Sequence, residues 1–169
     1  KLFAYNNRFN HLGSKFPRLA NFMFSNELTS SVIKNTFGIA KKRSLPLISN
    51  KSLSKCVQLA ENKIDKYNYI KEVYFFNDEF TNHLDASIGV DAIQLLEALS
   101  YKVNFINHTE SGRAFLSKGL LEQAKSFANK NVLIFKDLIS EKAPLIGLEP
   151  SAILTFKDEY LKLADDKKS

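Results

Sequence analysis

The sequence has 169 residues, of which 44% are hydrophobic and 25% are charged. This composition suits a folded domain and excludes wholesale disorder, and there is no run of about 18 apolar residues that could span a membrane. The single cysteine, Cys56, excludes an internal disulfide framework and any zinc or iron–sulfur site whose cysteine ligands all come from this sequence. A reducing, cytoplasmic setting is therefore expected.

Charge is distributed unevenly along the sequence, although the net charge is +6. Residues 1–71 contain 13 Lys and Arg against 3 Asp and Glu, whereas residues 72–169 contain 11 against 15. A basic first part suggests an acidic partner, or an ordinary solvated face. No signature of an RNA-reading module or a zinc finger accompanies the charge, so no nucleic-acid partner is expected.

The first part of the sequence, residues 1–70, is predicted to be a helical segment. Asn26 is a suitable N-cap for a helix over 27–37, and Gly38 stands where a helix-ending glycine belongs. A second helix is predicted over 52–65, after a basic, Pro-containing connection. The residues predicted to face inward are Leu28, Val32 and Ile33 in the first helix, and Leu53, Val57, Ala60 and Ile64 in the second.

The second part, residues 71–169, alternates strand and helix patterns. Short apolar runs at 72–77, 102–107 and 144–148 predict strands, and Glu149-Pro150-Ser151 is a suitable start for a final helix. The β-α-β-α-β-α order predicts an α/β fold: a small three-layer parallel sheet, preceded by the helical segment. The predicted inward-facing residues of the three helices are Ile88, Ala92, Leu95 and Leu99; Leu121, Ala124, Ala128, Val132, Phe135 and Ile139; and Ile153, Phe156, Tyr160 and Leu163.

Ligands of parallel α/β sheets usually bind in the loops at the carboxyl ends of the strands. These loops are rich in polar side chains here, which favours a binding or interface site; ordinary helix caps and loop polarity are the alternative explanation. Lys118 is predicted to begin a helix, where its charge is unfavourable. The candidates for substrate or interface contacts are Asp78, Thr81, Asn82, Glu110, Ser111, Arg113, Ser117, Lys118, Glu149 and Ser151.

Other chemistries have weaker support in these loops. His83 and His108, with Glu110 or Asp85, could ligate a metal, but two loop histidines far apart in sequence are a weak signal. Cys56 is predicted to be a small packed residue rather than a nucleophile. Neither a G-x-S-x-G elbow nor a dinucleotide-binding fingerprint is present.

The loop sequences carry a resemblance that covers residues 18–163. The stretch GRAFLSKGLL, followed by IGLEPSAILTFKDEY, resembles the first of two Cys-Cys-Gly domains at the C-terminal end of large FAD-linked oxidoreductases. These include D-lactate dehydrogenases and the iron–sulfur subunits of glycolate oxidase and anaerobic glycerol-3-phosphate dehydrogenase. The resemblance, the absence of an initial Met and the polar C-terminal end together lead us to expect a piece of a longer polypeptide.

The sequence departs from that family at the cysteines. Where the family has a cysteine near Phe80, a pair before the glycine of GR, and one after Pro-Ser, this sequence has Phe80, Glu110-Ser111 and Ala152. Thiolates hold iron–sulfur clusters, so the resemblance implies a scaffold that has lost its cluster. FAD and iron–sulfur clusters are expected elsewhere in the parent protein, and no cofactor is expected in this part.

Two function classes follow from the sequence. The first is a module of a 2-hydroxy-acid dehydrogenase, such as one acting on D-lactate or glycolate, that is not catalytic alone. Its partners would be the FAD domain, the ferredoxin-like domain and the second Cys-Cys-Gly half, with a peripheral contact on the inner face of the membrane as a further option. Arg113 could grip a substrate carboxylate in this class. The second class is a stand-alone α/β domain that binds a small anion or a divalent metal at the same edge, with Glu110 and Glu149 as acid–base groups or oxygen ligands.

Overall fold

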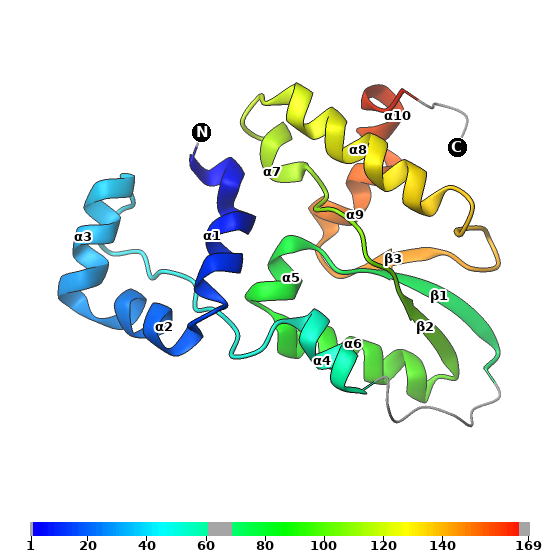
Figure 1. Cartoon of the computed structure of the whole chain (residues 1–169), viewed down its shortest axis with the longest axis horizontal. Coiled ribbons are helices and arrows are strands. Elements are labelled where there is room, and N and C mark those ends of the chain that lie inside the picture. Colours follow the sequence, from blue (N-terminus) through cyan, green and yellow to red (C-terminus); the bar gives the residue numbers. More distant parts are fainter. Residues whose placement is uncertain (1, 61–68, 166–169) are drawn as a thin grey trace.

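A computed structural model describes residues 2–60 and 69–165 of the chain (Figure 1). In this part the fold is mixed α/β, with a three-stranded parallel sheet that follows an N-terminal helical segment, as the sequence predicts. The strands are β1 (Lys71–Phe76), β2 (Tyr101–Phe105) and β3 (Leu145–Gly147), in the order β2-β1-β3. All three predicted strands are therefore confirmed, with ends that differ by one or two residues.

The central strand β1 supplies apolar side chains to both faces of the sheet. Phe75 packs with Leu53 and Ala86 on the face covered by α4 (Leu53–Ala60) and α6 (Ala86–Ala98). Its neighbour Phe76 packs with Phe135 and Ala152 on the other face, which is covered by α8 (Leu121–Phe135) and α9 (Pro150–Lys157). Successive residues of a strand point to opposite faces, so a continuous apolar run buries both, and the result is the three-layer arrangement of Figure 1.

The predicted helix between the first two strands is confirmed as α6, but of its four predicted inward-facing residues only Ala92 packs against the core. Ile88, Leu95 and Leu99 are exposed, whereas Ala86 and Gly89 are buried. The reason is the close approach of α4, because a Cβ at Gly89 would lie only 2.4 Å from Cδ2 of the buried Leu53. The face with the smallest residues therefore meets α4; Val90 and Ile93 pack against the same cluster, and the three exposed residues are left outside.

The later helices follow the predicted pattern with three differences. On α8, Ala124, Ala128 and Phe135 are buried as predicted, but Leu121 is exposed. The helix ends at Phe135, so Ile139, a predicted inward-facing residue, lies beyond its end and is exposed. The predicted final helix is interrupted after α9, and the chain resumes as α10 (Tyr160–Leu163), where Tyr160 is buried.

The N-terminal segment comprises η1 (Leu2–Tyr5), α1 (Asn6–Gly13), α2 (Pro17–Ser25) and α3 (Glu27–Phe37). The predicted limits of α3 are confirmed: the Asn26 side chain caps Leu28 and Thr29, and Gly38 ends the helix with a φ of 66°. Its predicted inward face is wrong, since Leu28 is 80% exposed and Val32 is 66% exposed. In Figure 1, α2 and α3 extend away from the sheet, so the described part of the chain does not cover these side chains.

The helical segment packs against the α/β part at several places, including a ring contact between His11 of α1 and His83 of α5. Ala4 of η1 lies in a cluster with Phe115 and Ala124, and Leu53 of α4 lies in the cluster of Phe75. The predicted helix over 52–65 is confirmed up to Ala60, and Ile64 lies outside the described residues. The division of the chain at residue 70 stays a prediction. None of the helices within residues 2–60 and 69–165 is long and apolar enough to cross a membrane.

Candidate functional site

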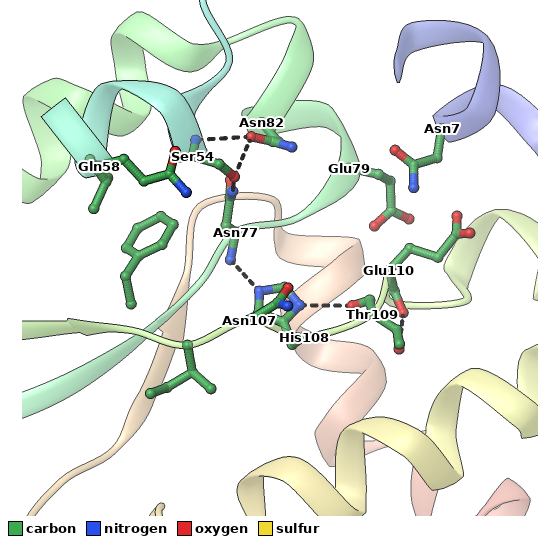
Figure 2. Close-up of a pocket in the computed structure, with 13 residues that line it drawn as sticks. Asn7, Ser54, Gln58, Asn77, Glu79, Asn82, Asn107, His108, Thr109 and Glu110 are labelled. Carbon is green, nitrogen blue, oxygen red and sulfur yellow. Dashed lines mark hydrogen bonds between the residues drawn. The ribbon is translucent and has the colours of Figure 1, made fainter. Parts of the chain in front are cut away.

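A pocket of about 460 Å³ opens at the carboxyl ends of β1 and β2 (Figure 2). The loop after β1 leads to α5 (Glu79–His83) and α6 on one face, and the loop after β2 leads to α7 (Arg113–Leu116) and α8 on the other. Because these two loops leave the sheet toward opposite faces, they form a crevice between them. The sequence therefore predicts the place of the pocket. Half of its polar lining residues have amide side chains: Asn7, Gln58, Asn77, Asn82 and Asn107.

Glu79 joins the two loops. Its side chain is 4% exposed, and its carboxylate accepts hydrogen bonds from the backbone N–H of Ser111 at 3.1 Å and from Ser111 Oγ at 2.8 Å. Burial raises the pKa of Glu79, because the ionised form loses its hydration, and the bonds from Ser111 oppose that rise. The Glu79 carboxylate thus holds Ser111, which directly precedes Gly112-Arg113, against α5.

Glu110 is the second carboxyl group in the pocket, and Figure 2 shows it with Glu79 and Asn7 at one end of the cavity. Burial, followed by the charge of the nearby Glu79, raises the pKa of Glu110 to about 7. The Asn7 side chain and the charge of Arg8 act in the opposite direction. Glu110 Oε2 is buried and has no hydrogen-bond partner among the described residues. This end of the pocket therefore combines a fixed carboxylate with a second one that titrates near neutral pH.

His108 is held in a single tautomer. The backbone N–H of Asn77 donates to Nε2 at 3.0 Å, and Nδ1 lies 2.7 Å from the carbonyl oxygen of Thr109. Since a backbone N–H only donates and a carbonyl only accepts, the ring carries its proton on Nδ1 and is neutral. Burial lowers the pKa of His108, in agreement with this state. Both ring nitrogens are therefore occupied in positioning the two loops.

A chain of polar side chains lines the other end of the pocket. Asn77 Nδ2 donates to Ser54 Oγ at 2.9 Å, and Ser54 Oγ donates to Asn82 Oδ1 at 3.0 Å. The backbone N–H of Ser54, on α4, donates to the same Asn82 oxygen at 3.1 Å. These bonds leave Asn77 Oδ1 as a buried acceptor with no partner in the described part of the chain.

Asn131 of α8 fixes the loop after β2 from behind. It is fully buried; its Oδ1 accepts from Thr109 N at 3.1 Å and Thr109 Oγ1 at 2.9 Å, and its Nδ2 donates to the carbonyl of Glu110 and to the Tyr160 hydroxyl. Tyr160 in turn donates to the carbonyl of Ser111 at 2.8 Å. The Asn131 amide and the Tyr160 hydroxyl thus hold three successive loop residues, 109–111, in place.

The predicted site residues divide into two groups. Asn82, Glu110 and His108 line the pocket, and Ser111 and Thr81 lie behind it. Asp78 is a buried helix cap: its Oδ1 accepts from the N–H groups of Phe80 and Thr81, both at 2.9 Å. The remaining predicted residues lie outside the pocket lining: Arg113, Ser117, Lys118, Glu149 and Ser151.

Those outlying residues have local partners. The Arg113 guanidinium pairs with Glu159 at 2.6 Å, and Glu149 caps α9 by accepting from Ser151 N and Ser151 Oγ. Ser117 Oγ donates to the carbonyl of Ala114 at 2.9 Å. The prediction that Lys118 begins a helix is wrong: it follows α7 in the turn before α8, because α7 ends at Leu116.

The donor set does not fit a metal or an iron–sulfur cluster. Among the described residues no three His, Cys, Asp or Glu side chains lie together as a metal site requires. His83 is buried in α5, and burial, followed by the nearby His11, lowers the pKa of His83 to about 4. The only cysteine of the sequence, Cys56, lies on α4, and Ala152 lies in the apolar cluster of Phe76. No chemistry through a cluster is therefore derived for this site.

Sequence reasoning missed several residues that form the pocket. Asn7 and Ser54 line the pocket from the helical segment, which has no strand edge to point to them. Asn131, which supports the pocket from behind, lies within a helix whose apolar stripe hides it. Glu79 could have been found, because it directly follows the helix cap Asp78 at a strand end.

Comparison with known proteins finds relatives of one kind. No family model and no solved structure matches the chain. The chain is 22% identical over 166 residues to a D-2-hydroxyglutarate dehydrogenase of Haemophilus influenzae, which covers 92% of the chain and 16% of that protein. It is 25% identical over 162 residues to the Escherichia coli protein of the same name, with 90% and 16% covered. The chain thus spans about one sixth of the length of these curated relatives, and they support the predicted similarity to part of a large 2-hydroxy-acid dehydrogenase.

Proposed function

We propose that this chain is a module of a larger FAD-linked 2-hydroxy-acid dehydrogenase, and that it binds no cluster and serves as a structural and interface element. The observation that carries the proposal is the similarity to D-2-hydroxyglutarate dehydrogenases over nine-tenths of the chain. The reacting 2-hydroxy acid, the flavin and any iron–sulfur cluster would then be bound by other parts of that protein.

The arrangement of the loops supports a structural role. The positions at which the Cys-Cys-Gly family has its cysteine pair hold Glu110 and Ser111, and Ser111 is fully buried and bonded to Glu79. Ala152, at a third such position, packs with Phe76 and Phe135. At the positions where the family has thiolate ligands, this chain therefore has hydrogen bonds and apolar contacts. These contacts connect the loops that a cluster would connect in the family.

The surface of the helical segment supports an interface role. Large apolar side chains on α2 and α3 are exposed, including Phe22, Leu28 and Val32, and the same segment is strongly basic. Apolar side chains gathered on one exposed face are typical of a surface that another structure covers. Within the proposed module, an acidic face of a neighbouring domain fits this surface, and an anionic membrane surface is the alternative partner.

The proposal is tested on the intact protein with two kinds of variant. Ser111→Ala should leave the iron content and the visible absorption spectrum unchanged, because no cluster depends on this loop. The double variant Leu28→Gln with Val32→Gln should lower the melting temperature of the intact protein, whereas Leu133→Gln, at an exposed leucine of α8, should not. Loss of iron in Ser111→Ala, or equal melting of the two surface variants, would contradict the proposal.

The pocket favours a second function, that of a stand-alone domain that binds a small ligand at the sheet edge. A cavity of about 460 Å³ lies within the range of small-molecule sites. The pocket suits neither of the two ligands that the sequence suggests. Its two carboxyl groups would repel a small anion, and its side chains do not provide the ligand set of a divalent metal. Thermal stabilisation of the chain by such a ligand would distinguish this function from the first.

A further inference from the structure

Two buried hydrogen-bond acceptors of the pocket are unsatisfied. Asn77 Oδ1 and Glu110 Oε2 are both shielded from solvent, both belong to residues that line the cavity, and neither has a partner among the described residues. Most buried polar atoms in folded proteins are paired, and each unpaired one costs free energy. Both vacant groups are acceptors, so a ligand that satisfies them must bring donors.

The charge of the cavity selects among ligands with donors. Two carboxyl groups, Glu79 and Glu110, line it, and no lysine or arginine among the described residues does. His108 is neutral, because its Nε2 accepts from Asn77 and its Nδ1 faces a carbonyl. Arg8 is close enough to influence Glu110, but it is exposed and does not line the cavity. Within the described part of the chain, the cavity therefore has two acidic side chains and no cationic one.

The Asn77 amide and the backbone that carries Glu110 are held in place before any ligand arrives. The Asn77 amide is oriented by its bond from Nδ2 to Ser54 Oγ, which leaves Oδ1 free to accept. Glu110 is carried on a loop whose carbonyl accepts from Asn131 at 3.0 Å. Groups that are already ordered lose little conformational entropy when a ligand binds.

We propose that this pocket binds a ligand whose primary ammonium group pairs with Glu110 as its counter-ion, while Asn77 Oδ1, at the other end of the pocket, accepts from a second donor of the same ligand. An ammonium group has three donors and no acceptor, which complements a carboxylate. Val57, Phe105 and Ile106 also line the cavity and provide apolar surface for a short carbon chain. The ammonium group belongs either to a free small amine or to a lysine from another part of the polypeptide. This inference goes beyond the proposed function and does not depend on it.

The first test is isothermal titration calorimetry of the intact protein with 1,4-diaminobutane, and with 1,4-butanediol as the neutral control. The diamine should bind, and the diol should not. Glu110→Gln should weaken the binding at least tenfold, and so should Asn77→Leu, which removes the other acceptor. Glu122→Gln, at an exposed acid at the start of α8, should bind as the wild type does. Equal binding of the diol, or unchanged binding in Glu110→Gln, would overturn the proposal.

The second test distinguishes the two sources of the ammonium group. Carbodiimide treatment of the intact protein, followed by peptide mass spectrometry, joins a carboxyl group to an amine in contact with it. A free-amine site should give a Glu110 adduct of added 1,4-diaminobutane. If a lysine fills the pocket, the diamine should give no heat, and Glu110 should be joined to that lysine. The proposal would be overturned if the diamine does not bind and Glu110 forms no adduct with either the diamine or a lysine.

Discussion

Asn131 is the residue whose loss should most disturb the site without any contact with a ligand. It is fully buried, and its amide makes four hydrogen bonds: two from Thr109, one to the carbonyl of Glu110 and one to the Tyr160 hydroxyl. Asn131→Ala removes all four and leaves a small cavity. With about 1 kcal/mol for each bond, and more for groups left buried and unpaired, the free energy of unfolding should fall by about 3–5 kcal/mol. For a chain of this size the melting temperature should fall by roughly 10 °C.

The matched control for this change is Asn129→Ala, two residues earlier on the same helix. Asn129 exchanges two hydrogen bonds with Asp165 in an exposed position, so its loss should cost less than about 1 kcal/mol. Urea unfolding of the chain, followed by far-ultraviolet circular dichroism, measures both changes. Tyr160→Phe adds a further check, because a double-mutant cycle with Asn131→Ala should give a coupling energy of about 1 kcal/mol. Equal losses for Asn131→Ala and Asn129→Ala would refute the reasoning.

Three further predictions concern single residues. The pKa of Glu110 is raised from 4.5 to about 7 in the folded chain, so the free energy of unfolding should fall as the pH rises through that window. In urea unfolding, the fall should be about 1–2 kcal/mol smaller in the Glu110→Gln variant, which is less than the full shift because the residue is partly exposed. Parallel pH profiles of the wild type and the variant would contradict this. Gly89→Ala should destabilise the chain by about 1–3 kcal/mol, since its Cβ would meet Leu53, and a Leu53→Val replacement should recover part of that loss in thermal melting. Arg113→Ala should lower the free energy of unfolding by less than about 1 kcal/mol, because its ion pair with Glu159 is partly exposed. If the guanidinium contacts the substrate, the same change should raise KM for the 2-hydroxy acid in the intact enzyme. Unchanged kinetics would exclude that role.

The strand order and the place of the pocket follow from sequence pattern because both depend on local signals. Apolar runs such as residues 72–77 mark strands buried on both faces, and the polar residues that follow them mark the edge where loops meet. The inward faces of α3 and α6 could not be predicted in this way. Hydrophobic periodicity shows which residues are apolar, but the partner decides which are covered: α4 selects Gly89 over Ile88, and the described part of the chain leaves Leu28 exposed.

The composition of the site could be predicted only in part, for a similar reason. Polar groups at strand ends, such as Asn82 and Glu110, are visible as loop residues, but Asn7, Ser54 and Asn131 enter from helices that are distant in sequence. These helical residues determine what the loop groups do. Ser54 holds the Asn77 amide, and Asn131 holds the carbonyl of Glu110. With those supports, the Asn77 amide and the backbone at Glu110 are held at the edge of the pocket, so two unpaired acceptors lie in a cavity that is lined by two acidic side chains.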